Sequence, residues 1–330
     1  MKKGLLKYLF STIARMLVLL VAVTLLSFLL VHNAPMDPVD AFLGEIVVSE
    51  EQRAKIAEHW GLDKSPAEQY VIWVKNTLHG DMGESRTYHE PVTKVLGERF
   101  RASLLLMGTA WILSGVLGLL LGIVAGVYKD HWPDRIIKTF SLILASTPVF
   151  WIGLLVLVVF AVELQWFPLG LAVPIGKVES EVTWMERLHH LVLPALTLSI
   201  TGVANIILHT RQKLIDVMES EYVLFAKARG ETLKQLVTRH GLRNIALPAI
   251  TLQFASISEL FGGSVLAERV FSYPGLGSTA VVAGMQADAP LLLGIALFSA
   301  LFVFAGNLTA NILYGIIDPQ IRVRREQWLI

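Results

Sequence analysis

The chain has 330 residues, of which 54% are hydrophobic and 17% are charged, against about 25% charged in soluble domains. So little polar surface excludes a soluble globular protein and, more firmly, a disordered chain. The net charge of +1 gives no electrostatic reason to expect nucleic acid as a partner, and the absence of cysteine excludes a disulfide framework, a thiol nucleophile and a thiolate metal site.

Six apolar stretches are long enough to cross a membrane, because a hydrocarbon core about 30 Å thick needs roughly 20 helical residues. The first ends at residue 32, after a short basic N-terminus, and the others are residues 102–128, 139–162, 191–210, 245–267 and 289–317. The stretch 245–267 is the weakest, since Glu259 interrupts it. We therefore predict an all-α integral membrane protein with six transmembrane helices.

The first apolar stretch also has features of a signal peptide, because Lys2, Lys3 and Lys7 precede it. It is longer than a typical signal core, and no cleavage site of the small-x-small type follows it before Pro35. We favour a retained membrane helix within residues 1–32.

The Lys and Arg content of the loops alternates along the chain and orients the helices. The N-terminus, the loops after the second and fourth stretches and the tail hold seventeen of these bases, whereas the two short alternate loops hold three. Basic residues of short loops stay in the cytoplasm. We therefore expect both termini in the cytoplasm, an external segment at 33–101, a cytoplasmic loop at 211–248 and a cytoplasmic tail at 318–330.

The external segment contains local signals for short helices. Ser49 with Gln52 three residues later is typical of a helix start, and Gly61 is placed to end that helix. We expect short helices that lie on the outer face of the membrane and do not form an independently stable domain.

Several short motifs resemble those of enzymes or metal sites, but the flanking sequence or the spacing that such sites need is missing. The stretch Gly275-Leu-Gly277-Ser-Thr-Ala280 nearly fits a dinucleotide fingerprint, but it lies between two predicted membrane helices and not between a strand and a helix. Gly176-Lys177 lacks the upstream glycine of a phosphate-binding loop, so we expect no ATP hydrolysis and no bound cofactor in this chain. His189 and His190 lack the i, i+4 spacing of helical metal ligands, and we predict no metal site.

Three glycines spaced four residues apart form a smooth ridge on the predicted helix 102–128. They are Gly118, Gly122 and Gly126. Such a ridge lets a second helix approach closely. It is equally well interpreted as a sliding seam of a transporter and as a static packing surface.

Glu259 is the one acid deep within a predicted span. A carboxylate near the bilayer centre costs about 2.5–3.5 kcal/mol on insertion scales, so it is expected to face protein or water. Two interpretations stay open: Glu259 lines a pathway for a polar solute, or it pairs with a polar group such as Asn307 or Asn311.

The cytoplasmic loop 211–248 has the pattern of two helices joined by a glycine corner. Residues 221–230 are helical in composition and end at Gly230, and an amphipathic stretch follows with Leu233, Leu236 and Val237 on one side. A rigid helical corner suits docking into a groove of another protein. The alternative is an interfacial loop attracted to anionic lipid by its basic residues.

This loop resembles the ATPase-coupling loop of binding-protein-dependent ABC importer permeases. Ala226 and Gly230 match the general pattern Glu-Ala-Ala-x-x-x-Gly, whereas Leu224 and Phe225 replace its Glu-Ala. The departure is typical of the dipeptide, oligopeptide and nickel branch. The stretches Ala226-Lys-Ala-Arg-Gly230 and His240-Gly-Leu-Arg-Asn244 are similar to that branch, with the basic residues permuted.

Four further motifs resemble the same branch in the same order along nearly the whole chain. They are Ala34-Pro-Met-Asp-Pro38, Gly80-Asp-Met-Gly-Glu-Ser85, the external loop Phe271-Ser-Tyr-Pro274-Gly275-Leu-Gly277, and Asp318-Pro319 followed by Arg322. Met36 stands where the branch has glycine.

The resemblance implies a permease subunit of an ATP-driven importer of di- or oligopeptides in the cytoplasmic (inner) membrane, or of nickel or a metal chelate. It implies a second permease subunit, two cytoplasmic ABC ATPase subunits that use ATP and Mg, and an external solute-binding protein. A self-sufficient secondary transporter and a membrane enzyme are disfavoured, because Glu259 stands alone in the spans and no catalytic cluster emerges.

The resemblance also implies which residues of the loop meet the ATPase. Ala226 is expected to be small because it sits close to the partner, and Arg229, Arg239 and Arg243 are candidates for salt bridges to the ATPase or to a lipid phosphate. The full set expected in the coupling loop is Glu221, Tyr222, Phe225, Ala226, Arg229, Gly230, Arg239, His240 and Arg243.

Overall fold

The computed structural model describes the chain except for residues 1, 34–37, 44–45, 47, 178–180 and 318–330. The predicted tail 318–330, the motif at Asp318-Pro319 and most of the motif at Ala34–Pro38 therefore lie outside the described residues. The chain divides into two compact units, residues 1–102 with 275–304 and residues 103–274 with 305 onward.

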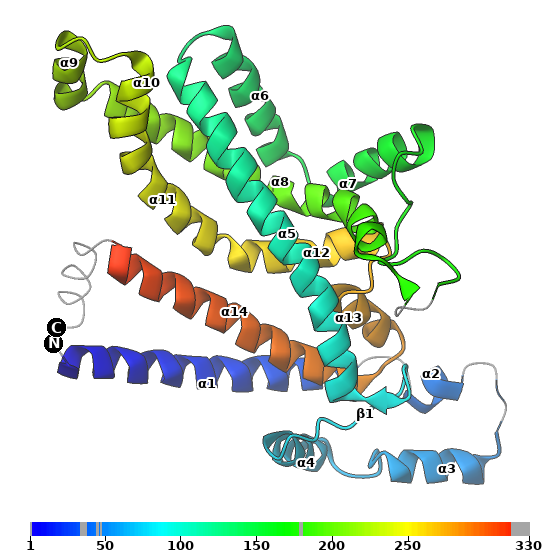
Figure 1. Ribbon diagram of the computed structural model, residues 1–330. Coiled ribbons are helices and arrows are strands. Elements are labelled where there is room, and N and C mark those ends of the chain that lie inside the picture. The colour runs from blue at the N-terminus through cyan, green and yellow to red at the C-terminus, as the bar shows by residue number, and fades with distance from the viewer. Residues whose placement is uncertain (1, 34–37, 44–45, 47, 178–180, 318–330) are drawn as a thin grey trace. The chain divides into compact units, whose positions relative to one another are not determined.

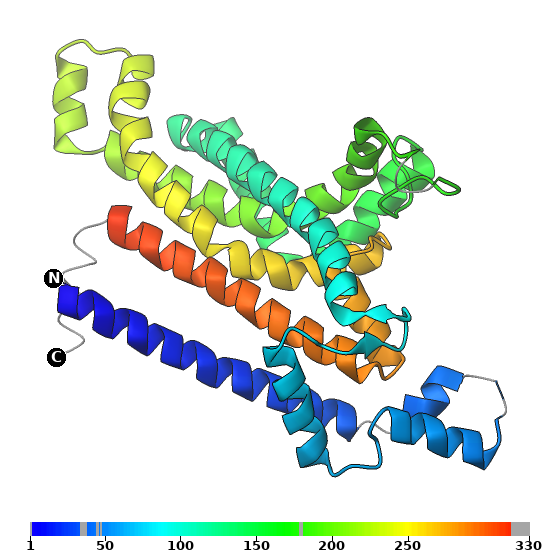
Figure 2. The ribbon, with the colours of Figure 1, turned by 60° about the horizontal axis from the view of Figure 1, so that its bottom comes forward.

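The first unit combines the long helix α1 with short helices and the start of α14 (Figures 1 and 2). Its elements are α1 (Lys2–His32), α2 (Pro38–Leu43), α3 (Glu50–His59), α4 (Pro66–Leu78), the strands β1 (Glu84–Ser85) and β2 (Glu90–Pro91), the first turns of α5 (Val92–Val127), α13 (Leu276–Met285) and α14 (Ala289–Ile317) up to residue 304. The two strands pair antiparallel.

Local capping signals set the ends of the short helices. Ser49 and Gln52 form the predicted capping box, in which each side chain bonds the other residue's backbone N–H. Gly61 has a φ of +68° just after α3, a conformation that costs glycine least, so the predicted helix end is also confirmed. A second capping box, Ser65 with Glu68, begins α4.

α4 packs against α1. The Tyr70 hydroxyl lies 2.9 Å from Thr24 Oγ1, and the Tyr70 ring stands 5.4 Å from the Phe28 ring. Thr24 lies eight residues before the end of α1, which corresponds to about 12 Å along a helix. The short helices of this segment are therefore anchored on the helix that precedes them.

Asp288 joins the strand hairpin to the start of α14. Its side chain is fully buried, and it accepts hydrogen bonds from Ser85 Oγ at 2.7 Å, Thr87 N at 3.0 Å and Leu291 N at 3.2 Å. The bond to Leu291 caps the N-terminus of α14. A buried carboxylate is tolerated here because three donors surround it.

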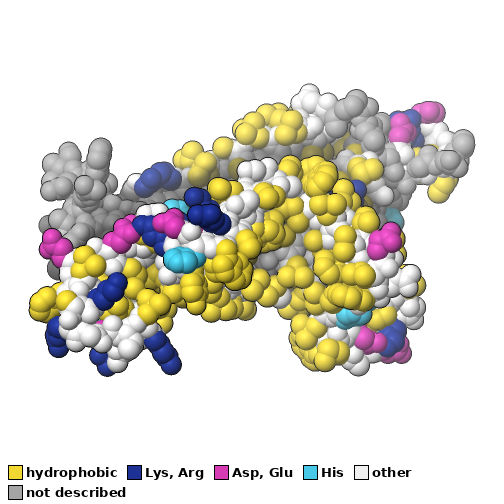
Figure 3. Space-filling model, turned by 90° about the horizontal axis from the view of Figure 1, so that it is seen from above, with side chains coloured by type: hydrophobic (Ala, Val, Ile, Leu, Met, Phe, Trp, Pro, Cys, Tyr) yellow, Lys and Arg dark blue, Asp and Glu magenta, His cyan; other side chains and the backbone are white. Residues whose placement is uncertain are grey.

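The second unit is built around α8 (Trp184–Met218). Against α8 pack α6 (Trp132–Ser146), α7 (Val149–Leu157), α11 (Leu242–Ala255) and α12 (Ile257–Val270). The π-helix η1 (Val158–Glu163) follows α7, and α9 (Glu221–Ala228), α10 (Leu233–Leu236) and the π-helix η3 (Val237–Gly241) lie between α8 and α11. Hydrophobic side chains cover much of the face seen in Figure 3, as expected for a protein in lipid.

The predicted apolar stretches map onto these helices with three bends, one of which, of 50°, lies within α8 between Ile200 and Gly202. α14 covers the same residues as the stretch 289–317, whereas α5 begins ten residues before the predicted 102 and α8 extends beyond 191–210 at both ends. The stretch 139–162 is not one helix, because α6 and α7 meet at 109° around Thr147-Pro148. Proline has no N–H and disfavours helix in the residue before it.

The stretch 245–267 is also bent, by 51° between α11 and α12 at Ser256. By length and composition, three described helices are long and apolar enough to cross a membrane, or up to six if each bent pair is one span.

The glycine ridge of α5 lies against α8. A Cβ at Gly118 would lie 2.7 Å from Ile206 Cβ, and one at Gly126 would lie 3.0 Å from Leu214 Cβ. All three glycines therefore occupy positions where the two backbones approach closely. This contact accounts for the ridge as a packing surface, while sliding along it stays a prediction.

Replacing Gly122 with alanine is expected to destabilise the protein. The new Cβ would lie 2.6 Å from Thr210 Cβ and 2.9 Å from the Ile207 carbonyl oxygen. Overpacking of this kind costs about 1–3 kcal/mol, although alanine gains roughly 1 kcal/mol in helix propensity. Thermal melting in detergent measures the change. Gly108→Ala on the same helix is the control, because its Cβ would meet nothing within 4 Å, and equal melting temperatures for the two variants would contradict the prediction.

Candidate functional site: the helical corner at residues 211–248

The corner begins where α8 ends and α9 turns back from it. Ser220 precedes α9 in an extended conformation, and its hydroxyl donates to the Val217 carbonyl at 2.5 Å. The corner of α9 and α10 projects past the end of α8 in both ribbon views (Figures 1 and 2).

Gly230 ends α9 in the left-handed conformation that the sequence predicts. Its φ is +92°. Gly230 N donates to Lys227 O at 3.0 Å and Glu231 N donates to Ala226 O at 3.2 Å, which is the pair of bonds of a Schellman motif. Thr232 and Gln235 then form a capping box at the start of α10. Backbone hydrogen bonds therefore fix the turn on both sides.

A small apolar cluster holds the two arms of the corner together. It consists of Val217, Val223, Ala226 and Leu236, with Met218 packed beside them. Leu233, predicted on the same side as Leu236, is instead 52% exposed. The corner is thus a packed unit with its own small core.

Ala226 faces this internal cluster. Its side chain is 7% exposed, so the packing of the chain's own helices accounts for the small size of this residue. The sequence analysis explained the same small size by closeness to a partner. Contact of Ala226 with an ATPase stays a prediction.

The outer surface of the corner is apolar and aromatic with basic residues around it. Phe225 is 67% exposed, Leu224 53% and Tyr222 49%. The side chains of Glu221, Arg229, Arg239 and Arg243 are also exposed. Exposed aromatic side chains fixed on a rigid element are typical of binding hot spots.

His240 lies inside the corner between its two arms. Its Nε2 is 3.4 Å from Glu231 Oε2, and its ring is 6.0 Å from the Tyr222 ring. Asn244 Nδ2 donates to the Tyr222 hydroxyl at 3.3 Å. These contacts tie α9 to η3 and α11.

Two of the three predicted pathway residues, Glu259 and Asn307, have described side chains. Glu259 is exposed on α12, and Asn307 accepts a hydrogen bond from Ser258 at 2.9 Å. The side chain of Asn311 lies outside the described residues. A role for Glu259 and Asn307 along a pathway stays a prediction.

The predicted external loop leads into α13. Gly275 caps α13 with a φ of −92°, and both Gly275 and Gly277 are buried, as is Tyr273. Burial raises the pKa of the Tyr273 hydroxyl to about 12, with Glu268 adding to the effect. Pro274 lies between Tyr273 and Gly275 and is partly buried. A functional role for this loop stays a prediction.

The sequence analysis did not single out three buried carboxylates, which are Asp288, described above, and Glu268 and Asp134. Glu268 is fully buried on α12 and accepts a hydrogen bond from Ser103 Oγ at 2.6 Å. Asp134, 2% exposed at the start of α6, accepts from Arg211 Nη2 at 2.7 Å. Glu268 stands one residue beyond the predicted stretch, and no local pattern points to Ser103, which is 165 residues away.

The two adjacent histidines each form a hydrogen bond with a backbone carbonyl oxygen. His189 Nε2 lies 2.9 Å from Trp166 O, and His190 Nδ1 lies 2.8 Å from Gly170 O. Among the described residues, no three His, Asp or Glu side chains are grouped as metal ligands.

Two family models together match most of the chain. Residues 118–323 match the family described as the inner membrane component of binding-protein-dependent transport systems, and residues 5–109 match the N-terminal family of the same membrane components.

Three curated relatives are similar over nearly their full length. The chain is 35% identical to the oligopeptide transport system permease protein AppB of Bacillus subtilis, over 92% of this chain and 95% of the relative. It is 33% identical to the di/tripeptide transport system permease protein DppB of Pseudomonas aeruginosa, over 96% and 99%. It is 32% identical to the glutathione transport system permease protein GsiC of Escherichia coli (strain K12), over 97% and 100%. The chain belongs to the family of inner membrane components of binding-protein-dependent transport systems.

Proposed function

We propose that the chain is a permease subunit of an ATP-driven importer that carries short peptides across the inner membrane by alternating access. The observation that carries the proposal is similarity over more than nine-tenths of the chain to permeases named for peptide transport. The third relative is named for glutathione, which is itself a tripeptide. Peptides are therefore favoured over nickel or a metal chelate as the substrate.

The assembly that we infer contains a second permease subunit, paired with this one as a heterodimer, two cytoplasmic ATPase subunits and an external solute-binding protein. ATP and Mg belong to the ATPases. Closure of the ATPases around ATP biases the permeases only if the two conformations differ in affinity for the closed pair. A stiff connection at the corner is needed to transmit that bias.

The geometry of the corner supports this coupling role. Its turn is fixed by the bonds around Gly230 and its arms by the cluster around Ala226 and Leu236. Phe225 is largely exposed, and Tyr222 is half exposed while it contacts His240 and Asn244, so both present surface to a groove. Arg229, Arg239 and Arg243 would pair with acidic groups of the ATPase or with lipid phosphates.

Uptake of the labelled tripeptide Ala-Phe-Ala tests the substrate class. Cells that lack their other peptide importers are expected to recover uptake when they express this chain with its partner subunits. Unlabelled tripeptide should compete and nickel chloride should not. An assembled transporter that hydrolyses ATP but takes up no di-, tri- or oligopeptide would contradict the proposal.

The proposed membrane arrangement has six spans with both termini and residues 211–248 in the cytoplasm. The chain has no cysteine, so single cysteines report topology without further changes. Lys55→Cys is expected to react with a membrane-impermeant maleimide in intact cells, whereas Lys234→Cys should react only after permeabilisation. Labelling of Lys234→Cys from outside would overturn the arrangement.

A further inference from the structure

The first unit contains a pocket to which the proposed transport function assigns no role. Its volume is about 550 Å³, within the range of about 300–1,000 Å³ in which proteins hold small ligands. The lining comes from the end of α1, from α3 and α4 and the loops around them, and from the first turns of α14. All of these residues belong to the same compact unit.

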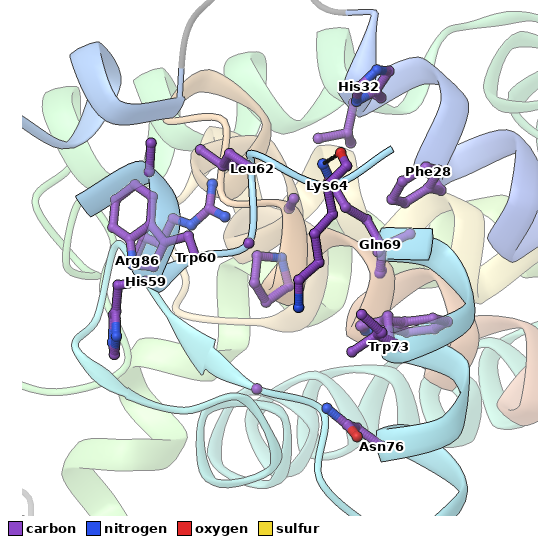
Figure 4. Close-up of a pocket in the computed structure, with 18 of the residues that line it drawn as sticks. Phe28, His32, His59, Trp60, Leu62, Lys64, Gln69, Trp73, Asn76 and Arg86 are labelled. Carbon is purple, nitrogen blue, oxygen red and sulfur yellow. Dashed lines mark hydrogen bonds between the residues drawn. The ribbon is translucent and has the colours of Figure 1, made fainter. Parts of the chain in front are cut away.

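Aromatic rings form two opposite walls of the pocket. On one side lies Trp60, with the Arg86 guanidinium 4.2 Å from its ring centroid. On the other side lie Phe28, Gln69 and Trp73 (Figure 4). Trp60 and Trp73 present large flat apolar surfaces with a polar edge, which suits a ligand with both apolar and polar parts.

The Lys64 side chain extends between the two walls (Figure 4). Within the described part of the chain, its ammonium group has no hydrogen bond or close ion pair, although its charge acts on Glu68, four residues later. Trp73 also lines the pocket, and its indole Nε1 is buried with no acceptor among the described groups. The polar group that the pocket offers to a ligand is therefore the Lys64 ammonium, whereas Trp73 contributes an apolar wall.

Arg86 is a second cation in the wall, and it is held in place. It donates to the Ala287 carbonyl at 3.5 Å and stacks on Trp60. Burial lowers its pKa from the ordinary value, and the nearby Asp288 offsets part of that effect. A positioned guanidinium is the preferred partner of a carboxylate.

Acidic groups line the same pocket. They are Glu58 and Asp81, and Asp81 Oδ1 also accepts from Gly83 N at 2.8 Å. A pocket that carries both signs of charge and aromatic walls matches a small molecule with a carboxylate, an ammonium and an apolar body. An anionic lipid headgroup such as phosphatidylglycerol carries no ammonium that these two acids could bind, whereas a free peptide does.

We propose that this pocket binds a short zwitterionic peptide, with its carboxylate at Lys64 and Arg86 and its ammonium at Glu58 or Asp81. The inference rests on the proposed function and deepens it, because it places a peptide site on the permease itself. Such a site would hold the peptide outside the membrane helices, on the segment 33–101 that the sequence predicts to be external.

Equilibrium binding of labelled Ala-Phe-Ala to the purified assembled transporter, without the solute-binding protein, tests this site. Lys64→Ala is expected to weaken binding at least tenfold, and Lys64→Arg to retain it. Lys55→Ala is the matched control, because Lys55 lies on α3 paired with Glu51 and does not line the pocket. Acetyl-Ala-Phe-Ala-amide, which lacks both end charges, should bind at least tenfold more weakly than the free tripeptide.

Equal affinity of Lys64→Ala and the unaltered protein would overturn the site, as would equal affinity for the blocked and free tripeptides. Displacement of the tripeptide by phosphatidylglycerol, lost in Lys64→Ala, would assign the pocket to lipid and also overturn the proposal. The uptake assay separates the two levels of inference. Intact uptake with unchanged binding by Lys64→Ala rejects the pocket alone, whereas no peptide uptake by the unaltered transporter rejects the proposed function.

Discussion

Phe225→Glu is expected to abolish association with the ATPases and peptide uptake together, while the chain itself stays folded. Phe225 is 67% exposed at the corner, so its replacement removes little internal packing. Loss of a central aromatic contact in an interface typically costs about 2 kcal/mol or more, which corresponds to roughly a 30-fold loss of affinity. A carboxylate left in an apolar groove adds to that cost. Co-purification of the ATPases and uptake of Ala-Phe-Ala provide the two readouts.

The matched control is Met185→Glu. Met185 is 75% exposed and lies in the first turn of α8. Phe225 lies at the other end of α8, in the helix α9 that follows it. The control adds the same charge at a similarly exposed apolar position, so it should leave ATPase association unchanged. If Phe225→Glu retains both ATPase and uptake, the corner is not the coupling element. If it instead reduces only the binding of the chain to vesicles with anionic lipid, the interfacial-loop interpretation is favoured.

The parts of the fold that the sequence predicted are those set by a few neighbouring residues. The capping box of Ser49 and Gln52 and the helix ends at Gly61 and Gly230 depend on hydrogen bonds that span at most five residues. Such local bonds follow from residue type and spacing. The backbone path of the helical corner was therefore predictable from the sequence.

The orientation of side chains around that shape depends on distant residues and was not predictable. Ala226 is buried because Leu236 returns to it across the turn. Glu268 is buried because α5 brings Ser103 beside α12. Pro148 lies within the predicted stretch 139–162 and favours a break there, but the angle of 109° is set by how α6 and α7 each pack on α8.

The pocket of the first unit could not be predicted from the sequence for a similar reason. Trp60, Lys64 and Trp73 lie close together in the sequence, whereas Arg86 and the first turns of α14 complete the walls from further along the chain. Only the packing of α4 on α1, through Tyr70 and Thr24, gives those residues a common cavity wall.

Asp134→Asn is expected to lower the melting temperature of the protein more than any exposed charge substitution near it. Asp134 accepts from Arg211 Nε at 2.5 Å and Nη2 at 2.7 Å, and from Asp130 N at 2.8 Å. Removing one partner of a buried pair costs about 3–5 kcal/mol, because the remaining charge is left uncompensated. Arg211 is 13% exposed, which gives it some access to solvent and places the effect near the lower end.

Glu219→Gln is the matched control for Asp134→Asn. The Lys129–Glu219 pair also links the α5–α6 connection to the end of α8, but its side chains are 42% and 60% exposed, so its loss should cost at most about 1 kcal/mol. The paired change Asp134→Leu with Arg211→Leu should recover much of the lost stability, since apolar replacement of a whole buried pair is often tolerated. Thermal melting in detergent compares the three variants. If Asp134→Asn melts no lower than Glu219→Gln, the Asp134–Arg211 pair does not hold α6 to the end of α8, from which the corner projects.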